Sequence, residues 1–183
     1  MNRRDFLLRS SKKPFSPPAI ESAGLEPYTG EWTSKQAYHL LRRAMFGATP
    51  KDVATILKGS MSQAVDMLLT PVPVAAPIAY VNTGGVTQGQ QWATAGYDAN
   101  QENSRLTQLQ SWWIKLMLDQ GISLTEKMTL FWHNHFSCGA NSVKDARYMY
   151  KQNDLLRQNV LGNFKTLVKQ ISLDPAMLRY LSG

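Results

Sequence analysis

The residues with the clearest chemical potential lie in one short stretch, Phe131 to Phe136, which reads FWHNHF. It holds His133 and His135, two of the three histidines in the chain, with the amide of Asn134 between them. A neutral imidazole can bind a metal ion or transfer a proton near pH 7. We therefore take His133 and His135 as candidate ligands of a divalent metal, His133 and Glu126 as candidate catalytic residues, and Asn134 as a candidate binding residue.

The spacing of the two histidines limits what they can do together. Ser123 and Glu126 match the pattern of a capping box, which predicts a helix across the whole stretch. Positions i and i+2 of a helix lie about 200° apart, so His133 and His135 should face different sides. Glu126 lies two turns before His133, roughly 10 Å by the helical rise, which is too far to orient the ring directly. The favoured alternative is that both imidazoles are packed inside, with His135 leaning toward the core.

Four other features could carry chemistry, and each has a plainer interpretation. Arg42 and Arg43 are candidate anion-binding residues, although paired arginines usually form a solvated helix face. His39 is more simply a helix-surface or packing residue, and Cys138 a small buried thiol. Asp145, Arg147, Asp154 and Arg157 are expected to form surface or interhelical ion pairs.

The net charge of +7 is concentrated at one end of the chain. Residues 1–13 hold five basic side chains and one acidic, or +4, whereas residues 14–183 hold 15 basic and 12 acidic, or +3. A nucleic-acid surface concentrates charge on a folded face, so we expect no nucleic-acid partner. No apolar run reaches the roughly 18 residues that span a bilayer, so we also expect no transmembrane segment.

Helical signals recur from Thr33 to the end of the chain. Thr33 to Gln36 and Thr49 to Asp52 match capping boxes, and Asp174-Pro175 opens a last short piece. We predict an all-α fold of about seven helices in an irregular bundle. Residues 1–31 form a basic, Pro-rich arm, and residues 32–183 form the helical domain. Residues 71–100, rich in proline and glycine, form a long loop insertion with a short strand at Ile78–Val81.

The helix after this loop carries an apolar stripe at three- and four-residue spacing. The stripe consists of Leu106, Leu109, Trp113, Leu116 and Met117. It predicts that Trp113 lies in the core and Trp112 at its rim.

The first residues match half of an export signal. Asn2 to Leu8, read as NRRDFLL, resembles a twin-arginine signal, but the apolar stretch that should follow is replaced by polar and charged residues. We favour a basic tail with a short apolar anchor over a working signal.

Five segments in order resemble blocks of a large bacterial family, domain-of-unknown-function family 1800. They are HLLRRAMFGATP from His39, EKMTLFWHNHF from Glu126, QNDLLR from Gln152, LGNF from Leu161 and DPAML from Asp174. The resemblance covers about residues 32–183. It implies no established biochemical activity, and it implies an exported or cell-envelope protein.

The family pattern continues beyond these blocks, so the resemblance implies that this chain is the N-terminal portion of a longer domain. Two functions remain open. The first is a non-catalytic interaction or cell-envelope module, whose partner is another envelope protein or the chain's own missing C-terminal half. The second is part of a metal-dependent or His-based enzyme whose site that half completes.

Overall fold

The computed structural model describes residues 26–182. The chain divides into two units, Met1–Glu31 and Trp32–Gly183, and the second unit holds the helices described below. The expected twin-arginine-like start and most of the basic arm lie outside the described residues.

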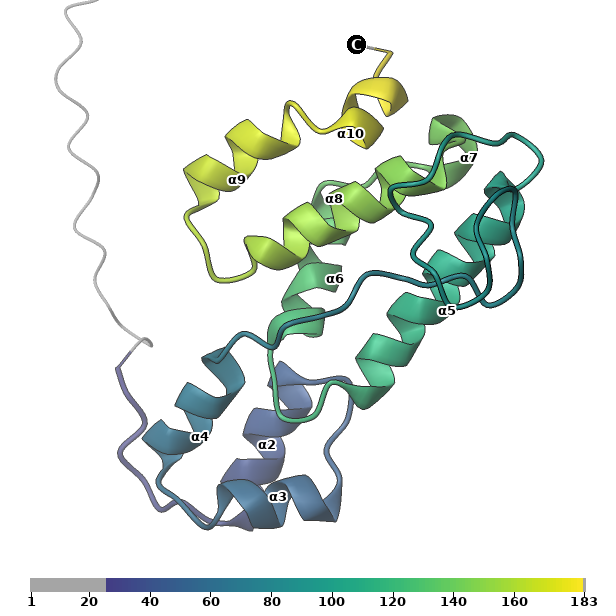
Figure 1. Cartoon of the computed structure of the whole chain (residues 1–183). Coiled ribbons are helices and arrows are strands. Elements are labelled where there is room, and N and C mark those ends of the chain that lie inside the picture. Colours follow the sequence, from purple (N-terminus) through teal and green to yellow (C-terminus); the bar gives the residue numbers. More distant parts are fainter. Residues whose placement is uncertain (1–25, 183) are drawn as a thin grey trace, which may run out of the picture. The chain divides into compact units, whose positions relative to one another are not determined.

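The described part of the chain is all-α, as predicted (Figure 1). Its nine helices are α2 (Ser34–Ala44), α3 (Pro50–Ile56), α4 (Met61–Leu69), α5 (Glu102–Asp119), α6 (Thr125–His135), α7 (Ala140–Val143), α8 (Ala146–Gln158), α9 (Phe164–Ile171) and α10 (Pro175–Tyr180). The count exceeds the predicted seven partly because α7 is a single turn with no sequence signal of its own. Among these nine helices, none has both the length and the apolar character that crossing a membrane requires.

Two helix starts carry complete capping boxes, and the one at Thr49 was predicted. The Thr49 hydroxyl accepts a hydrogen bond from the Asp52 amide at 3.2 Å, and the Thr49 amide donates to the Asp52 carboxylate at 2.9 Å. Ser60 and Gln63 form a second such box at the start of α4. These reciprocal bonds satisfy amides that the first turn of a helix leaves without partners.

Two predicted capping boxes do not form. The Thr33 hydroxyl bonds to the side-chain oxygen of Gln36 and therefore does not cap the backbone of α2. At the start of α6, Ser123 Oγ accepts from the Thr125 amide at 3.2 Å, one residue earlier than a box requires. The Glu126 carboxylate does not return to Ser123 because it binds side chains of two other helices.

Three apolar clusters stabilise the unit. The first joins the long loop to α5, α7 and α8, with Trp92, Leu109 and Val143 among its buried members. The second is formed by α2, α3 and α4. The third packs Leu156 of α8 against Leu167 and Ile171 of α9. In Figure 1, α2, α3 and α4 lie at one end of this unit, and α8, α9 and α10 lie at the other.

The loop between α4 and α5 is irregular, as predicted, but it is firmly packed. Trp92 is completely buried, and α5 side chains satisfy the loop backbone. Trp112 Nε1 donates to the Ala75 carbonyl at 3.1 Å, and Arg105 donates to the Gly96 carbonyl at 2.9 Å. The predicted strand at Ile78–Val81 is wrong, because the described residues there form only one isolated bridge, between Ile78 and Gln91.

The buried face of α5 is rotated from the predicted stripe. Trp112 is buried and Trp113 is only half-buried, the reverse of the prediction. The reason is that α5 turns Arg105, Gln108 and Trp112 toward the loop, where their side chains serve its backbone. Of the predicted stripe only Leu109 is fully buried.

Candidate functional site

Glu126 is held in a buried ion pair at the start of α6. Arg157 of α8 donates to its carboxylate through Nε at 2.7 Å and through an Nη atom at 2.9 Å. Trp113 of α5 adds a third hydrogen bond through Nε1 at 2.8 Å. Because three donors from α5 and α8 occupy its two oxygens, the carboxylate joins three helices. Arg157 is thus interhelical, one of the two arrangements expected for it.

His133 contacts Trp113 through ring packing and not through a hydrogen bond. Its ring meets the indole edge to face, with centroids 4.9 Å apart. Burial lowers the pKa of His133 below its ordinary value of 6.5, which favours the neutral ring. Its Nδ1 is buried without a hydrogen-bond partner. Trp113 therefore contacts both predicted catalytic residues, His133 and Glu126, while among the described residues no hydrogen bond joins the two.

His135 and Asn134 are exposed at the end of α6. The expectation that His135 leans toward the core is wrong, because Trp132 and Phe136 occupy the inward positions on either side of it. His135 lies edge-on to Phe136 at 4.6 Å and to Phe164, the first residue of α9, at 6.4 Å. As the helical spacing predicts, the two histidines contact different helices.

The end of α6 and the start of α9 form an aromatic cluster, which we define as Phe131, Trp132, His135, Phe136 and Phe164. The ring of Trp132 stacks on Phe136 at 6.0 Å and on Phe164 at 5.6 Å, with planes 23° and 25° apart. Phe131 and Phe164 are each 53% exposed. Stacked rings usually lie inside a protein, so half-exposed ones mark a surface with apolar area left to bury.

A divalent metal has few candidate ligands here. Within residues 26–182 there is no group of three or more His, Cys, Asp or Glu side chains close enough to hold an ion. His133 and His135 diverge, and the oxygens of Glu126 are taken by Arg157 and Trp113. The residues that the structure describes thus bring no third such ligand to His133 or His135, and the metal site stays a prediction.

The polar face of α8 was not predicted. Both amide atoms of Asn153 are buried without a partner, as are Nε2 of Gln152 and one Nη atom of Arg157. Gln152 also accepts a hydrogen bond at 2.8 Å from Cys138, a buried thiol whose pKa burial raises. The available signal was the spacing of Gln152 and Asn153 from Leu156, which places both amides on the buried side of α8.

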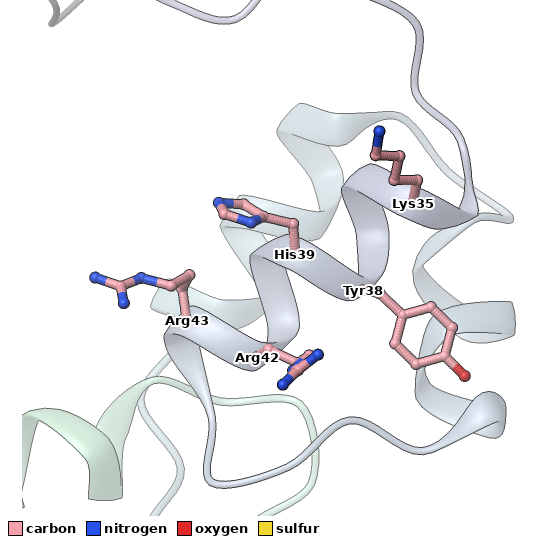
Figure 2. A pocket seen from close by; sticks show the side chains of 5 residues that line it. All are labelled: Lys35, Tyr38, His39, Arg42 and Arg43. Carbon is pink, nitrogen blue, oxygen red and sulfur yellow. The ribbon is translucent and has the colours of Figure 1, made fainter.

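Arg42 and Arg43 lie on the exposed side of α2. Together with Lys35, Tyr38 and His39 they line an open hollow of about 540 Å³ (Figure 2). None of the salt bridges recorded among residues 26–182 involves these side chains. The predicted catalytic residues on α6 and the predicted anion-binding residues on α2 are therefore parts of two separate surfaces.

Comparison with known proteins gives one result. A family described as "Protein of unknown function (DUF1800)" matches residues 39–183. No curated protein and no solved structure matches the chain.

Proposed function

Because this chain belongs to the DUF1800 family, whose function is not known, we propose from its own surfaces that it is a non-catalytic interaction module. It binds a partner protein through the aromatic cluster and the exposed side chains of α9 and α10. The occupant is an amphipathic, acidic helix of a partner protein, such as a component of the cell envelope.

The observation that carries this proposal is the apolar surface of α9, α10 and the turn between them. Leu173 is 76% exposed and Leu181 is 67% exposed, and each lies just after a helix that has buried residues of its own. We call this surface, with the exposed members of the aromatic cluster, the C-terminal apolar face. It comprises Phe131, Phe164, Val168, Leu173, Leu178, Tyr180 and Leu181. Grouped apolar exposure of this kind is typical of a protein-binding site.

The charges around this face indicate that the partner is acidic. Lys165, Lys169 and Arg179 are exposed on α9 and α10. The one acidic residue in this part of the described chain, Asp174, is buried and caps α10 through the Met177 amide at 2.9 Å. An apolar face with a basic rim complements an amphipathic helix whose apolar side is flanked by Glu and Asp.

The geometry of α6 also favours binding over catalysis. A general base needs an oxygen or nitrogen within reach of a substrate proton. The oxygens of Glu126 are held by Arg157 and Trp113, and Nδ1 of His133 is enclosed.

The experiment uses a labelled peptide of 18 residues, designed as an amphipathic helix of Leu and Glu, and a matched Leu and Lys peptide. We expect the acidic peptide alone to raise fluorescence anisotropy. The double variant Phe164→Asp, Leu181→Asp should abolish this binding. Leu118→Asp is the control, because Leu118 is 78% exposed on α5, outside the face.

Three outcomes would contradict the proposal. They are no binding, equal loss of binding in the Leu118→Asp control, and binding of anionic lipid vesicles without binding of the acidic peptide. Circular dichroism shows whether each variant remains helical.

The second candidate is part of a metal-dependent or His-based enzyme, and one observation favours it. His133 combines a lowered pKa with an unpartnered Nδ1, which suits a ligand or a base once a further group faces it. Elemental analysis of the purified protein and of His133→Ala tests this candidate. Stoichiometric metal that disappears in a folded His133→Ala variant would favour the enzyme, and absence of metal from both proteins would count against the metal-dependent form.

A further inference from the structure

The exposed side of α2 carries several basic side chains close together. Lys35, Tyr38, His39, Arg42 and Arg43 project from one side of the helix and line the hollow of about 540 Å³. At about 100° per residue, the five positions fall within an arc of about 140°. Figure 2 shows Lys35, His39 and Arg43 in one row along the helix, with Tyr38 and Arg42 in the neighbouring row. We call these five residues the α2 basic face.

The charges of this face are not balanced by their own helix. The sequence of α2 contains no Asp or Glu, and the four ion pairs recorded among residues 26–182 lie elsewhere. Like charges one turn apart on a helix repel one another. No side chain within α2 therefore balances the positive charges of the α2 basic face.

Helix stability accounts for only part of this arrangement. Arg42 and Arg43 lie in the last turn, where a positive charge interacts favourably with the helix dipole. Lys35 lies in the first turn, where the same dipole disfavours it. Thr33 does not offset this, because its side chain makes no cap hydrogen bond. Lys35 thus adds positive charge where a helix gains nothing from it.

We propose that the α2 basic face binds phosphate groups. The planar guanidinium of an arginine can donate two parallel hydrogen bonds to phosphate oxygens, and Arg42 and Arg43 each supply one such group to this face. Lys35 supplies a further positive charge, and Tyr38 and His39 supply further polar groups. The phosphate can belong to a lipid headgroup or to a soluble compound, because the chemistry of recognition is the same.

This binding is separate from the proposed docking of a partner protein. The α2 basic face lies on the cluster formed by α2, α3 and α4, and the C-terminal apolar face lies on α9 and α10 at the other end of the unit (Figure 1). If the ligand is a lipid headgroup, one surface would hold the membrane while the other holds a protein.

The test compares two variants that remove the same charge from the full chain. Arg42→Gln, Arg43→Gln removes two charges from the α2 basic face, and Lys165→Gln, Lys169→Gln removes two from α9. Both variants retain the basic residues of positions 1–13, so those contribute equally. The probes are pyrophosphate, measured by calorimetry, and sedimented vesicles of phosphatidylglycerol with phosphatidylcholine, each at 50 and 150 mM salt.

We expect the wild-type chain to bind pyrophosphate or the vesicles. The arginine variant should bind about 30-fold more weakly, since each cation near an anionic surface contributes about 1 kcal/mol. The lysine variant should change affinity less than threefold by the same reasoning, because its charges lie outside the face. Binding of both probes identifies phosphate itself as the ligand, and binding of vesicles alone identifies the lipid headgroup; both outcomes support the proposal.

Three results would overturn it. The first is an equal loss of affinity in the two variants, which would show that only net charge matters. The second is binding to neither probe. The third is binding of duplex DNA without binding of pyrophosphate or vesicles, which would assign the face to nucleic acid.

Discussion

The long loop has an irregular backbone but buried side chains, whereas the last two helices have a regular backbone but exposed apolar side chains. The loop from Pro71 to Gln101 has no helix, yet Trp92 and Ala79 are almost completely buried. Helices α9 and α10 are regular, yet Phe164 of α9 is 53% exposed and Tyr180 of α10 is 42% exposed. The difference teaches that a regular backbone does not imply a covered side chain. Burial here follows from which partners α5 and α8 provide.

The largest expected effect on stability comes from truncating the buried tryptophan of the loop. Trp92→Ala should reduce the free energy of unfolding by about 4 kcal/mol, because truncating a buried aromatic residue leaves a cavity. Urea unfolding followed by circular dichroism measures this. Tyr97→Ala is the control, because Tyr97 lies in the same loop and is 51% exposed. Similar losses in both variants would mean that the buried Trp92 stabilises the fold no more than an exposed residue of the same loop does.

The same contrast between buried and exposed groups applies to ion pairs. Arg157→Met leaves the buried carboxylate of Glu126 without its cation, and should reduce the free energy of unfolding by about 3 kcal/mol. Lys115→Met, in an exposed ion pair with Asp119 on α5, should leave the urea midpoint unchanged. If Arg157→Met also leaves it unchanged, the α6–α8 pair does not stabilise the fold.

The two histidines of α6 extend the contrast to pH. Burial holds the pKa of His133 in the folded chain below the 6.5 of an unperturbed ring. As the pH falls through 6.5, the unfolded chain therefore gains a proton that the folded chain does not, and stability decreases. This loss, measured as the fall in urea midpoint from pH 7.5 to 5.0, should become smaller in His133→Gln. His135→Gln, at the exposed ring, should keep the wild-type dependence. A full dependence in His133→Gln would show that another group causes it.

The smallest effect on stability is expected for an exposed apolar side chain between α9 and α10. Leu173→Ser should change the free energy of unfolding by no more than about 0.5 kcal/mol, because an exposed side chain loses few contacts. The urea midpoint measures this. A loss above about 2 kcal/mol, in the range of core truncations, would mean that the side chain is covered in solution.

A local structure can be predicted from the sequence when the residues that form its hydrogen bonds are close together in the chain. The Thr49 box needs only Asp52, and the Asp174 cap only Met177, so both starts were readable from adjacent residues. Ser123 and Glu126 match the same pattern, but Arg157 takes the carboxylate from 31 positions away. Nothing in a local pattern reports a competitor at that distance.

The face of α5 was mispredicted for the same reason. Spacing alone places Trp113 on the same face as the leucines around it. Trp112 is buried instead, because its indole donates a hydrogen bond to the Ala75 carbonyl in the loop. The roles of the candidate site residues stay predictions. The divergence of His133 and His135 follows from helical geometry, but the contact of His135 with Phe164 of another helix could not be read from spacing.

The three apolar clusters differ in the length of chain that each one closes. The eight buried residues of the cluster formed by α2, α3 and α4 lie between Ala37 and Leu68. The cluster around Trp92 draws together residues from Ala79 to Ala176. Contacts between near neighbours in the sequence form fastest, and longer loops lose more entropy on closure. The cluster formed by α2, α3 and α4 should therefore fold before the cluster around Trp92, with its amides exchanging with solvent as one cooperative group.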